Sequence, residues 1–238
     1  MLPEAEVERV LVVTAHPDDV DFGAGGTIAT LVHRGVGVTY CVITDGDAGG
    51  FDPAVPRSEI PRIRRREQAA AAECLGVKDV RFLGYKDGEL TVSHELRRDI
   101  SRVIRQVRPQ VVMMQSPERN WQRIYGSHPD HLAAGEAAIQ SIYPDARNPF
   151  AHPSLLNDEG LEPWSVPEAW VMVGPKPNYW VDVTDTFELK LAALRAHESQ
   201  TAHITELEAT LRDWLRANAN AAGLPEGRLA ESFMKVVT

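Results

Sequence analysis

The stretch VERVLVVTAHPDD, residues 7–19, joins a strand-like run to a polar turn. Its first part, residues 7–14, is rich in β-branched residues, which favour β-strands. The motif His16-Pro17-Asp18-Asp19 follows directly. A second motif of the same design, His128-Pro129-Asp130-His131, comes after the apolar run 110–115. Each motif therefore places imidazole and carboxylate groups beyond a predicted strand.

Proline stands second in both motifs, and proline is favoured at the first position of a helix. If each motif opens a helix, His16 and Asp19 lie on one helix face, and His128 and His131 do the same. Imidazole and carboxylate side chains would then converge at the ends of two strands. The two motifs together predict a site for a divalent metal ion.

The rest of the chain alternates strand-like and helix-like segments. Strands are expected at residues 7–14, 36–44, 80–83, 110–115, 168–173 and 179–183. Helices are expected at residues 23–34, 60–75, 94–107 and 186–218, the last broken near Gln200. This alternation predicts one α/β domain over residues 1–238, with a Rossmann-like, doubly wound, mostly parallel sheet flanked by helices. Ligands of such sheets bind beyond the carboxyl ends of the strands, where both motifs and the loop 45–50 are expected to lie.

The composition limits which binding partners and which cellular compartment are expected. A net charge of -9 argues against nucleic acid and against an anionic membrane surface, since both call for basic patches. Cys41 and Cys74 lie in apolar segments and are expected to be core thiols. There is no apolar run of about 18 residues and no basic leader, so a cytoplasmic protein is expected. A small-molecule substrate is expected, and a homo-oligomer is left open.

The side chains of the two motifs narrow the choice of metal ion. Imidazole and carboxylate groups without thiolate suit zinc, Fe(II) or manganese. A catalytic zinc keeps three protein ligands and one open position. Two histidines and a carboxylate also describe the site of Fe(II) oxygenases, but those usually have β-rich barrels. One Zn²⁺ per chain is therefore the expected cofactor, with Fe²⁺ or another divalent metal as the alternative.

A dinucleotide site is the contrasting interpretation. Glycines 23, 25 and 26 follow the first strand, and Asp45 ends the second, where a ribose-binding acid would lie. However, Ile28 occupies the place of the third glycine of the fingerprint, and the first motif separates the strand from the glycines. A nucleotide-binding module is therefore disfavoured, and the glycines are expected to pack the first helix closely on the sheet.

Several segments carry a resemblance to a known family. Residues 14–19 (Thr-Ala-His-Pro-Asp-Asp), Gly25-Gly26-Thr27 and the second motif resemble the PIG-L/LmbE-like deacetylases, including those of the bacillithiol and mycothiol pathways. Further family-like segments are residues 64–68, 75–77, 82–87 and 196–200. The resemblance implies a zinc-dependent hydrolase that removes an acyl group, with acetyl favoured, from an N-acylated glucosamine derivative. The alternative is an amidase acting on a larger thiol-sugar conjugate or a natural-product intermediate.

The resemblance also implies the zinc ligands and the base. His16, Asp19 and His131 would hold the zinc ion. Asp18 would be the general base that activates water. The equivalence of His128 and His131 on one helix face does not by itself decide which of them is a ligand.

The remaining roles come from the same resemblance. It makes His128 a catalytic group near the scissile carbonyl, oriented by Asp130. Arg64 and Asp87 match positions that contact the sugar in family members, although Arg64 is equally well explained as part of a solvated, basic helix face. Tyr125 is one residue out of register with a tyrosine that assists catalysis in some members, and it is not assigned a role.

The other histidines are interpreted as structural by default, with His197 close enough to a family-like segment to lie near the site. They are His33, His94, His152, His197 and His203. Three variable loops are expected to decide the substrate: residues 50–61, 121–127 and 147–167. A loop as long as the last one is typically a functional lid or a disordered segment.

Overall fold

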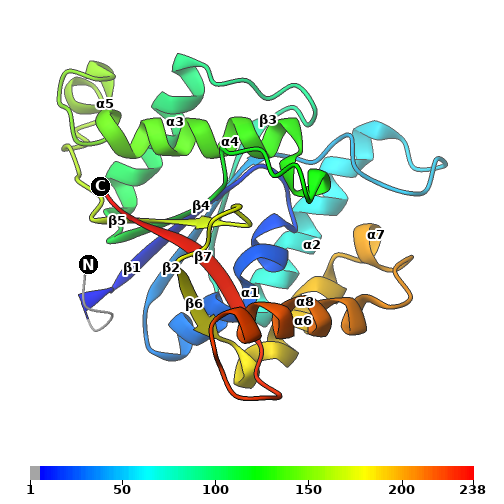
Figure 1. Cartoon of the computed structure of the whole chain (residues 1–238). Helices are drawn as coiled ribbons and strands as arrows, with labels where there is room; N and C mark the ends of the chain where they lie inside the picture. Colours follow the sequence, from blue (N-terminus) through cyan, green and yellow to red (C-terminus); the bar gives the residue numbers. More distant parts are fainter. Residues whose placement is uncertain (1–5) are drawn as a thin grey trace.

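The computed structural model describes residues 6–238 as one sheet covered by helices on both faces (Figure 1). The sheet has seven strands in the order β3-β2-β1-β4-β5-β7-β6. The strands are β1 Arg9–Thr14, β2 Gly37–Thr44, β3 Asp79–Tyr85, β4 Val111–Gln115, β5 Glu168–Met172, β6 Tyr179–Asp182 and β7 Ala230–Val237. The helices are α1 Asp19–His33, α2 Ile60–Cys74, α3 His94–Val107, α4 Pro129–Gln140, α5 Pro153–Asn157, α6 Phe187–Ala196, α7 Glu198–Thr201 and α8 Leu207–Ala221.

The first five strands are parallel, and β1 lies at the centre between β2 and β4. The last two strands are antiparallel: β7 pairs with β5, and β6 pairs with β7. The prediction of an α/β fold with a mostly parallel sheet is therefore correct. The carboxyl ends of β1, β2 and β4 meet at one edge, which brings the segments after Thr14, Thr44 and Gln115 together.

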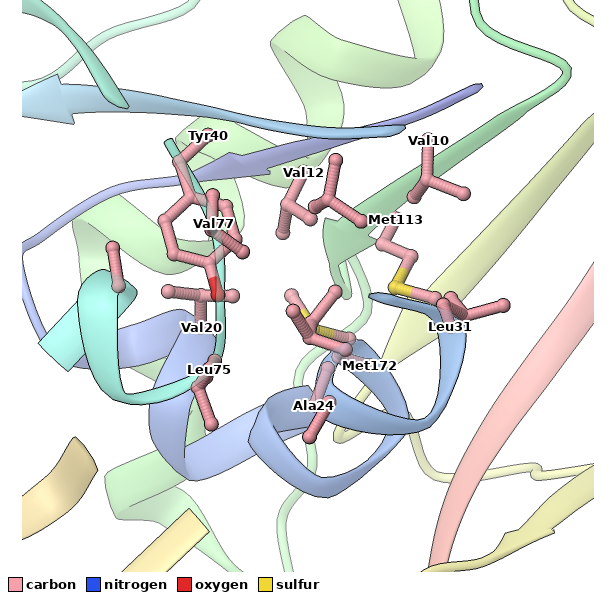
Figure 2. Packing of buried hydrophobic residues seen from close by; sticks show 14 of the residues in the cluster. Val10, Val12, Val20, Ala24, Leu31, Tyr40, Leu75, Val77, Met113 and Met172 are labelled. Atoms are coloured by element: carbon pink, nitrogen blue, oxygen red, sulfur yellow. The ribbon is translucent and has the colours of Figure 1, made fainter. Parts of the chain in front are cut away.

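Alternating residues along the strands point to opposite faces of the sheet and contribute to two separate hydrophobic cores. Val10 and Val12 of β1 point to the face covered by α1, α2 and α6, where they pack with residues such as Ala24 and Met113 (Figure 2). Leu11 and Val13 of the same strand point to the opposite face, which α3 and α4 cover. Period-two alternation in strands buried on both faces explains why these runs are continuously apolar.

The predicted close packing of the first helix holds, but its glycines lie inside the helix rather than before it. A Cβ atom at Gly26 would lie 2.7 Å from Cβ of Val183, and one at Gly25 would lie 3.2 Å from Cγ of Lys190. The helix thus approaches its neighbours as only glycine allows. Asp45 forms a two-pronged ion pair with Arg65, and the glycines lie within α1 rather than in a tight turn between β1 and the helix, so the arrangement differs from that of a dinucleotide fingerprint.

Strand β7 was not predicted, and it ties the carboxyl-terminal part of the chain to α1. The carboxylate of Glu231 accepts hydrogen bonds from the backbone N–H groups of Gly26 and Thr27. It also pairs with Nζ of the fully buried Lys190 at 2.7 Å. Helix α8 packs in a third apolar cluster with α6, beside this network.

The loop 147–167 was expected to be a lid or disordered, and it is neither. It contains α5 and is held by the buried guanidinium of Arg105, which donates to the carbonyls of Asn148, Ala151 and Leu161. Trp164 donates its indole N–H to the carbonyl of Pro109, just before β4 begins. The loop therefore lies at the edge of the sheet opposite to the motifs. Among residues 6–238, the structure contains no helix that is long and apolar enough to span a bilayer.

Candidate metal centre and active site

The first motif forms a tight turn rather than the start of a helix. Helix α1 begins at Asp19, and Asp18 precedes it with a left-handed φ of 95°. Aspartate is one of the residues that tolerate this region. The carboxylate of Asp19 folds back to accept a hydrogen bond from the backbone N–H of His16 at 2.7 Å. The sequence predicted that His16 and Asp19 share a helix face. They meet instead through this turn.

The second motif does open a helix. Pro129 is at the first turn of α4, and His128 caps the helix with its ring, because Nδ1 accepts a hydrogen bond from the backbone N–H of Asp130 at 3.2 Å. His131 lies within the first turn and faces the turn after β1. The two motifs thus converge from the ends of β1 and β4.

Three side chains of the two motifs converge. Nδ1 of His16 lies 3.2 Å from Nε2 of His131 and 3.4 Å from Oδ2 of Asp19. Nε2 of His131 lies 3.0 Å from Oδ1 of Asp19. Ligand atoms bound tetrahedrally at the usual Zn–N and Zn–O distances would be separated by about 3.3 Å. The spacing of these three side chains therefore fits a small divalent ion.

The charges around His16 also fit a cation. Burial lowers the pKa of His16, but hydrogen bonds to Asp130, Asp19 and Asp87 raise it to about 12. The carboxylates around His16 therefore favour a positive charge at this position. A divalent ion between His16, Asp19 and His131 would supply that charge. Two further groups of possible ligands share His16, namely His16–His128–His131 and His16–Asp87–Asp130, and their donors are also imidazole and carboxylate groups.

The other ring nitrogen of His16 is held by two carboxylates. Nε2 lies 3.1 Å from Oδ2 of Asp130 and 3.1 Å from Oδ1 of Asp87. Asp130 is held in turn by the backbone N–H groups of Gly88 and Leu90. If Nδ1 bound a metal ion, the remaining proton of His16 would lie on Nε2 between these carboxylates, which is the usual way a protein orients a ligating histidine.

This arrangement corrects the predicted role of Asp130. The resemblance implied that its carboxylate orients His128, but that carboxylate contacts His16 instead. Only the backbone N–H of Asp130 reaches the His128 ring. The reason is the helix cap, which occupies Nδ1 of His128 and leaves the Asp130 side chain directed into the fold.

Asp18 lies beside the cluster and is positioned from two sides. Its backbone N–H donates to Oε1 of Gln68 at 2.8 Å, and its carboxylate lies 3.2 Å from Nη2 of Arg64. Burial raises the pKa of Asp18 to about 6, against the lowering effect of the Arg64 charge. A carboxyl group with a raised pKa is suited to accept and release a proton near neutral pH.

Arg64 and Asp87, the predicted sugar contacts, are both buried at the site. Besides Asp18, the Arg64 guanidinium reaches the carbonyls of Pro17 and Gly46. A Cβ atom at Gly46, whose φ is +64°, would lie 2.2 Å from Nη1 of Arg64. The glycine-rich loop after β2 therefore packs directly on Arg64, which excludes the solvated-face interpretation. Contact of either side chain with a sugar stays a prediction.

A fully buried network behind Asp18 was missed from the sequence. Nε2 of Gln68 donates to Oδ2 of Asp21 at 2.8 Å, and the same oxygen lies 2.8 Å from Nε2 of His197. On the other side of the site, Oε1 of Gln115 accepts a hydrogen bond from the backbone N–H of Ala15. His197 is thus close to the site but supports it from behind. Gln68 falls in the family-like segment 64–68, but amide side chains carry no spacing signal of their own, so neither glutamine was assigned a role.

A cavity of about 430 Å³ adjoins Asp19 and His131. Tyr125, from the loop before the second motif, is exposed and lines the mouth of the cavity, where its hydroxyl accepts a hydrogen bond from Nε of Arg123 at 2.9 Å. Of the loops expected to decide the substrate, residues 121–127 therefore do border the site.

Comparisons with known proteins show which proteins this chain is similar to. The family model described as PIG-L: GlcNAc-PI de-N-acetylase matches residues 11–142. A diacetylchitobiose deacetylase from Thermococcus kodakarensis is 39% identical over 83% of this chain and 72% of its own length. A probable N-acetyl-alpha-D-glucosaminyl L-malate deacetylase 2 from Bacillus cereus is 35% identical over 83% of this chain and 86% of its own length.

A solved structure is similar over almost the whole chain. The N,N'-diacetylchitobiose deacetylase from Pyrococcus horikoshii, in complex with an inhibitor, aligns with a TM-score of 0.90 at 36% identity. The alignment covers 99% of this chain and 86% of that one. The resemblance seen in the motifs is confirmed. The chain belongs to the PIG-L family of GlcNAc-PI de-N-acetylases.

Proposed function

We propose that this protein is a metal-dependent amide hydrolase that removes an acyl group, with acetyl favoured, from an N-acylated glucosamine derivative. The observation that carries the proposal is the convergence of His16, Asp19 and His131 to within 3.4 Å of one another. It is supported by family membership and by relatives whose names describe deacetylation of N-acetylglucosamine derivatives.

In this proposal, His16, Asp19 and His131 hold one Zn²⁺ ion at the carboxyl ends of the strands of a Rossmann-like sheet. The order of the five parallel strands and the position of the motifs after β1 and β4 support this placement. A bound divalent ion supplies Lewis-acid activation of a carbonyl group and of water. Three protein ligands leave a coordination position open for that chemistry.

Asp18 acts as the general base. It takes a proton as the oxygen of a water molecule forms a bond to the amide carbon, and the C–N bond then breaks. The products are the free amine, which leaves with the proton that the water gave up, and a carboxylic acid, which then loses its own proton to the solvent and becomes a carboxylate. The Arg64 ion pair and the Gln68 hydrogen bond hold Asp18 in its left-handed backbone conformation for this task.

His128 stabilises the negative charge that develops on the carbonyl oxygen. Because its Nδ1 accepts the backbone N–H of Asp130, the neutral ring carries its proton on Nε2. Partial desolvation of the ring, followed by the charges of the neighbouring His16 and His131, lowers the pKa of His128, which keeps the ring neutral near pH 7. The Nε2–H group of such a ring can donate a hydrogen bond to the developing oxyanion. The exposed position of His128 leaves the ring accessible to a substrate.

The proposal is tested with purified protein by elemental analysis and by amine release from a panel of N-acetylglucosamine conjugates. We expect about one zinc per chain, loss of activity on treatment with a chelator, and recovery when zinc is restored. Including larger sugar conjugates in the panel separates the favoured substrates from the amidase alternative. Absence of hydrolysis across the panel by the zinc-loaded protein would contradict the proposal.

A further inference from the structure

The cavity beside the proposed metal ligands Asp19 and His131 has an apolar wall and a polar rim. We call it the α8 pocket, because helix α8 forms the apolar wall together with α1. That wall includes Phe22, Leu211 and Trp214. The polar side chains are those of Gln115, Ser116, Arg123, Tyr125 and Thr210. Because a few polar groups usually give a ligand pocket its specificity, these side chains indicate which part of a substrate the α8 pocket binds.

Arg123 carries a positive charge at the mouth of the pocket and has no acidic partner. Within residues 6–238, its guanidinium contacts the hydroxyl of Tyr125, to which Nε donates at 2.9 Å, and the rings of Tyr125 and Trp214, at 5.5 Å and 5.2 Å. Neither Nη1 nor Nη2 has a hydrogen-bond acceptor in that part of the chain. Acidic residues outnumber basic ones by 34 to 25, so a shortage of carboxylates does not explain the unpaired charge.

The two free nitrogens form a fork that suits an oxyanion. A guanidinium donates through two parallel N–H groups to the oxygens of a carboxylate or a phosphate. The hydroxyl of Tyr125 accepts from Nε of Arg123, so its own hydrogen remains available for donation. The mouth of the pocket therefore offers a positive charge together with several hydrogen-bond donors.

The loop that carries Arg123 is held in place by its own hydrogen bonds. The side-chain oxygen Oδ1 of Asn120 accepts from the backbone N–H groups of Gln122 and Arg123. The backbone N–H of Asn120 donates to the hydroxyl of the buried Ser127 at 2.8 Å. The two aromatic rings then fix the guanidinium itself. A group that is ordered before binding loses less conformational entropy when the ligand arrives.

The position of the pocket indicates which part of the substrate carries the anion. In an N-acetylglucosamine derivative, the acetyl group and the ring hydroxyls are uncharged. The amide is attached to C2 of the sugar, and C1, which carries the aglycone, is bonded directly to C2, whereas C6 lies on the far side of the ring. A pocket that adjoins the metal ligands is therefore reached from C1.

We propose that Arg123 binds an oxyanion, a carboxylate or a phosphate, on the aglycone of the substrate. The preferred substrates are then anionic conjugates of N-acetylglucosamine rather than neutral ones. This inference rests on the proposed function, because the amide that is cleaved beside Asp19 and His131 places the aglycone in the α8 pocket.

The test compares the carboxymethyl glycoside of N-acetylglucosamine with its carbamoylmethyl analogue, each as both anomers. The two aglycones have nearly the same shape, and only the carboxymethyl group is charged at neutral pH. Hydrogen bonds to a charged group predict a kcat/KM about 10- to 100-fold higher for the carboxymethyl glycoside. A still higher value for N-acetylglucosamine 1-phosphate would identify the oxyanion as a phosphate.

Two other substrates can overturn the inference in the unmodified protein. N,N'-diacetylchitobiose has a neutral aglycone, and N-acetylglucosamine 6-phosphate carries its charge at C6. A higher kcat/KM for either of them than for both substrates with an anionic aglycone would contradict the proposed role of Arg123. Equal values for the carboxymethyl and carbamoylmethyl glycosides would do the same.

Substitution of Arg123 tests the residue itself. In R123Q the ratio of kcat/KM between the carboxymethyl and carbamoylmethyl glycosides should fall to about one, mainly through a higher KM for the carboxymethyl glycoside, since Arg123 lies away from the amide that reacts. R123K keeps the charge without the fork and should give an intermediate ratio. An unchanged ratio in R123Q would overturn the inference.

The matched control is R119Q, which removes the same charge from the same loop. Arg119 is exposed, lies over the ring of Trp121 and does not line the α8 pocket. This variant should keep the ratio of the unmodified protein. A ratio that falls as far in R119Q as in R123Q would mean that the general charge of the loop, and not the fork of Arg123, attracts the anion.

Binding of the amine products separates the two proposals. In calorimetry with the zinc-loaded protein, the carboxymethyl glycoside of glucosamine should bind more tightly than the carbamoylmethyl glycoside, and R123Q should remove this difference. If none of the substrates is cleaved, the proposed function fails. Equal binding of the two products overturns the inference about Arg123, even if both substrates are cleaved.

Discussion

Replacement of Gln68 by leucine tests how the buried network positions Asp18. Gln68 is fully buried, and its amide serves both the backbone N–H of Asp18 and the carboxylate of Asp21. Leucine has a similar volume but offers neither a donor nor an acceptor. The variant therefore removes two hydrogen bonds without opening a large cavity.

The expected loss of stability follows from the two polar groups that Q68L leaves without a hydrogen-bond partner. A buried N–H without an acceptor costs about 1–3 kcal/mol, and a charged carboxylate that loses a donor costs about 1.5–3 kcal/mol. Together they predict that Q68L lowers the free energy of unfolding by about 3–5 kcal/mol. Asp18 also loses the contact that holds its left-handed backbone, so kcat should fall by roughly 10- to 100-fold, as expected for a displaced catalytic group.

Urea denaturation of the zinc-loaded protein, together with steady-state kinetics, measures both effects. Q106L is the matched control, since Gln106 is exposed and accepts a hydrogen bond only at the surface, from Arg81. Its unfolding free energy should change by less than about 0.5 kcal/mol. A loss below about 1 kcal/mol in Q68L, with kcat unchanged, would refute the role assigned to this network.

Two further predictions concern buried charges. Burial raises the pKa of Asp18 to about 6, and the positive charge of Arg64 acts against this rise. In R64M the pKa of Asp18 should therefore rise further, and the acidic limb of the kcat–pH profile should move to higher pH. R64K, which keeps the positive charge, should move the profile less. An unshifted profile in R64M would show that Asp18 is not the titrating base. In K190M the Glu231 carboxylate loses its buried partner, and thermal or urea unfolding should reveal a loss of about 3–5 kcal/mol. A loss below about 1 kcal/mol would mean that the backbone N–H groups of α1 satisfy Glu231 by themselves.

The sequence predicts the framework of the fold well because the framework depends on repeated patterns. The parallel strands are long apolar runs, and helices such as α3 at residues 94–107 have clear periodicity. Strand β7 was missed because it carries the buried Glu231, whose partner Lys190 lies far away in sequence. A charge in a strand suggests exposure unless its partner is known.

The two histidine motifs show where sequence reasoning about the site stops. Their spacing was enough to predict that imidazole and carboxylate groups converge, because residues three positions apart lie close together both in a helix and in a turn. Spacing did not reveal that Asp18 adopts a left-handed conformation. It also did not reveal that Asp130 serves His16, because that contact joins residues 114 positions apart and depends on how β1 and β4 pair.

The most direct test of the metal centre compares D18N with D19N by zinc stoichiometry and by kcat. Both substitutions preserve side-chain shape, and only Asp19 lies between His16 and His131. We predict that D18N keeps about one zinc per chain and loses roughly 10²–10⁴ in kcat, as expected when a general base is removed. D19N should instead bind zinc weakly, with activity partly restored by added zinc. Loss of zinc in D18N together with full zinc occupancy in D19N would contradict the assignment of ligand and base.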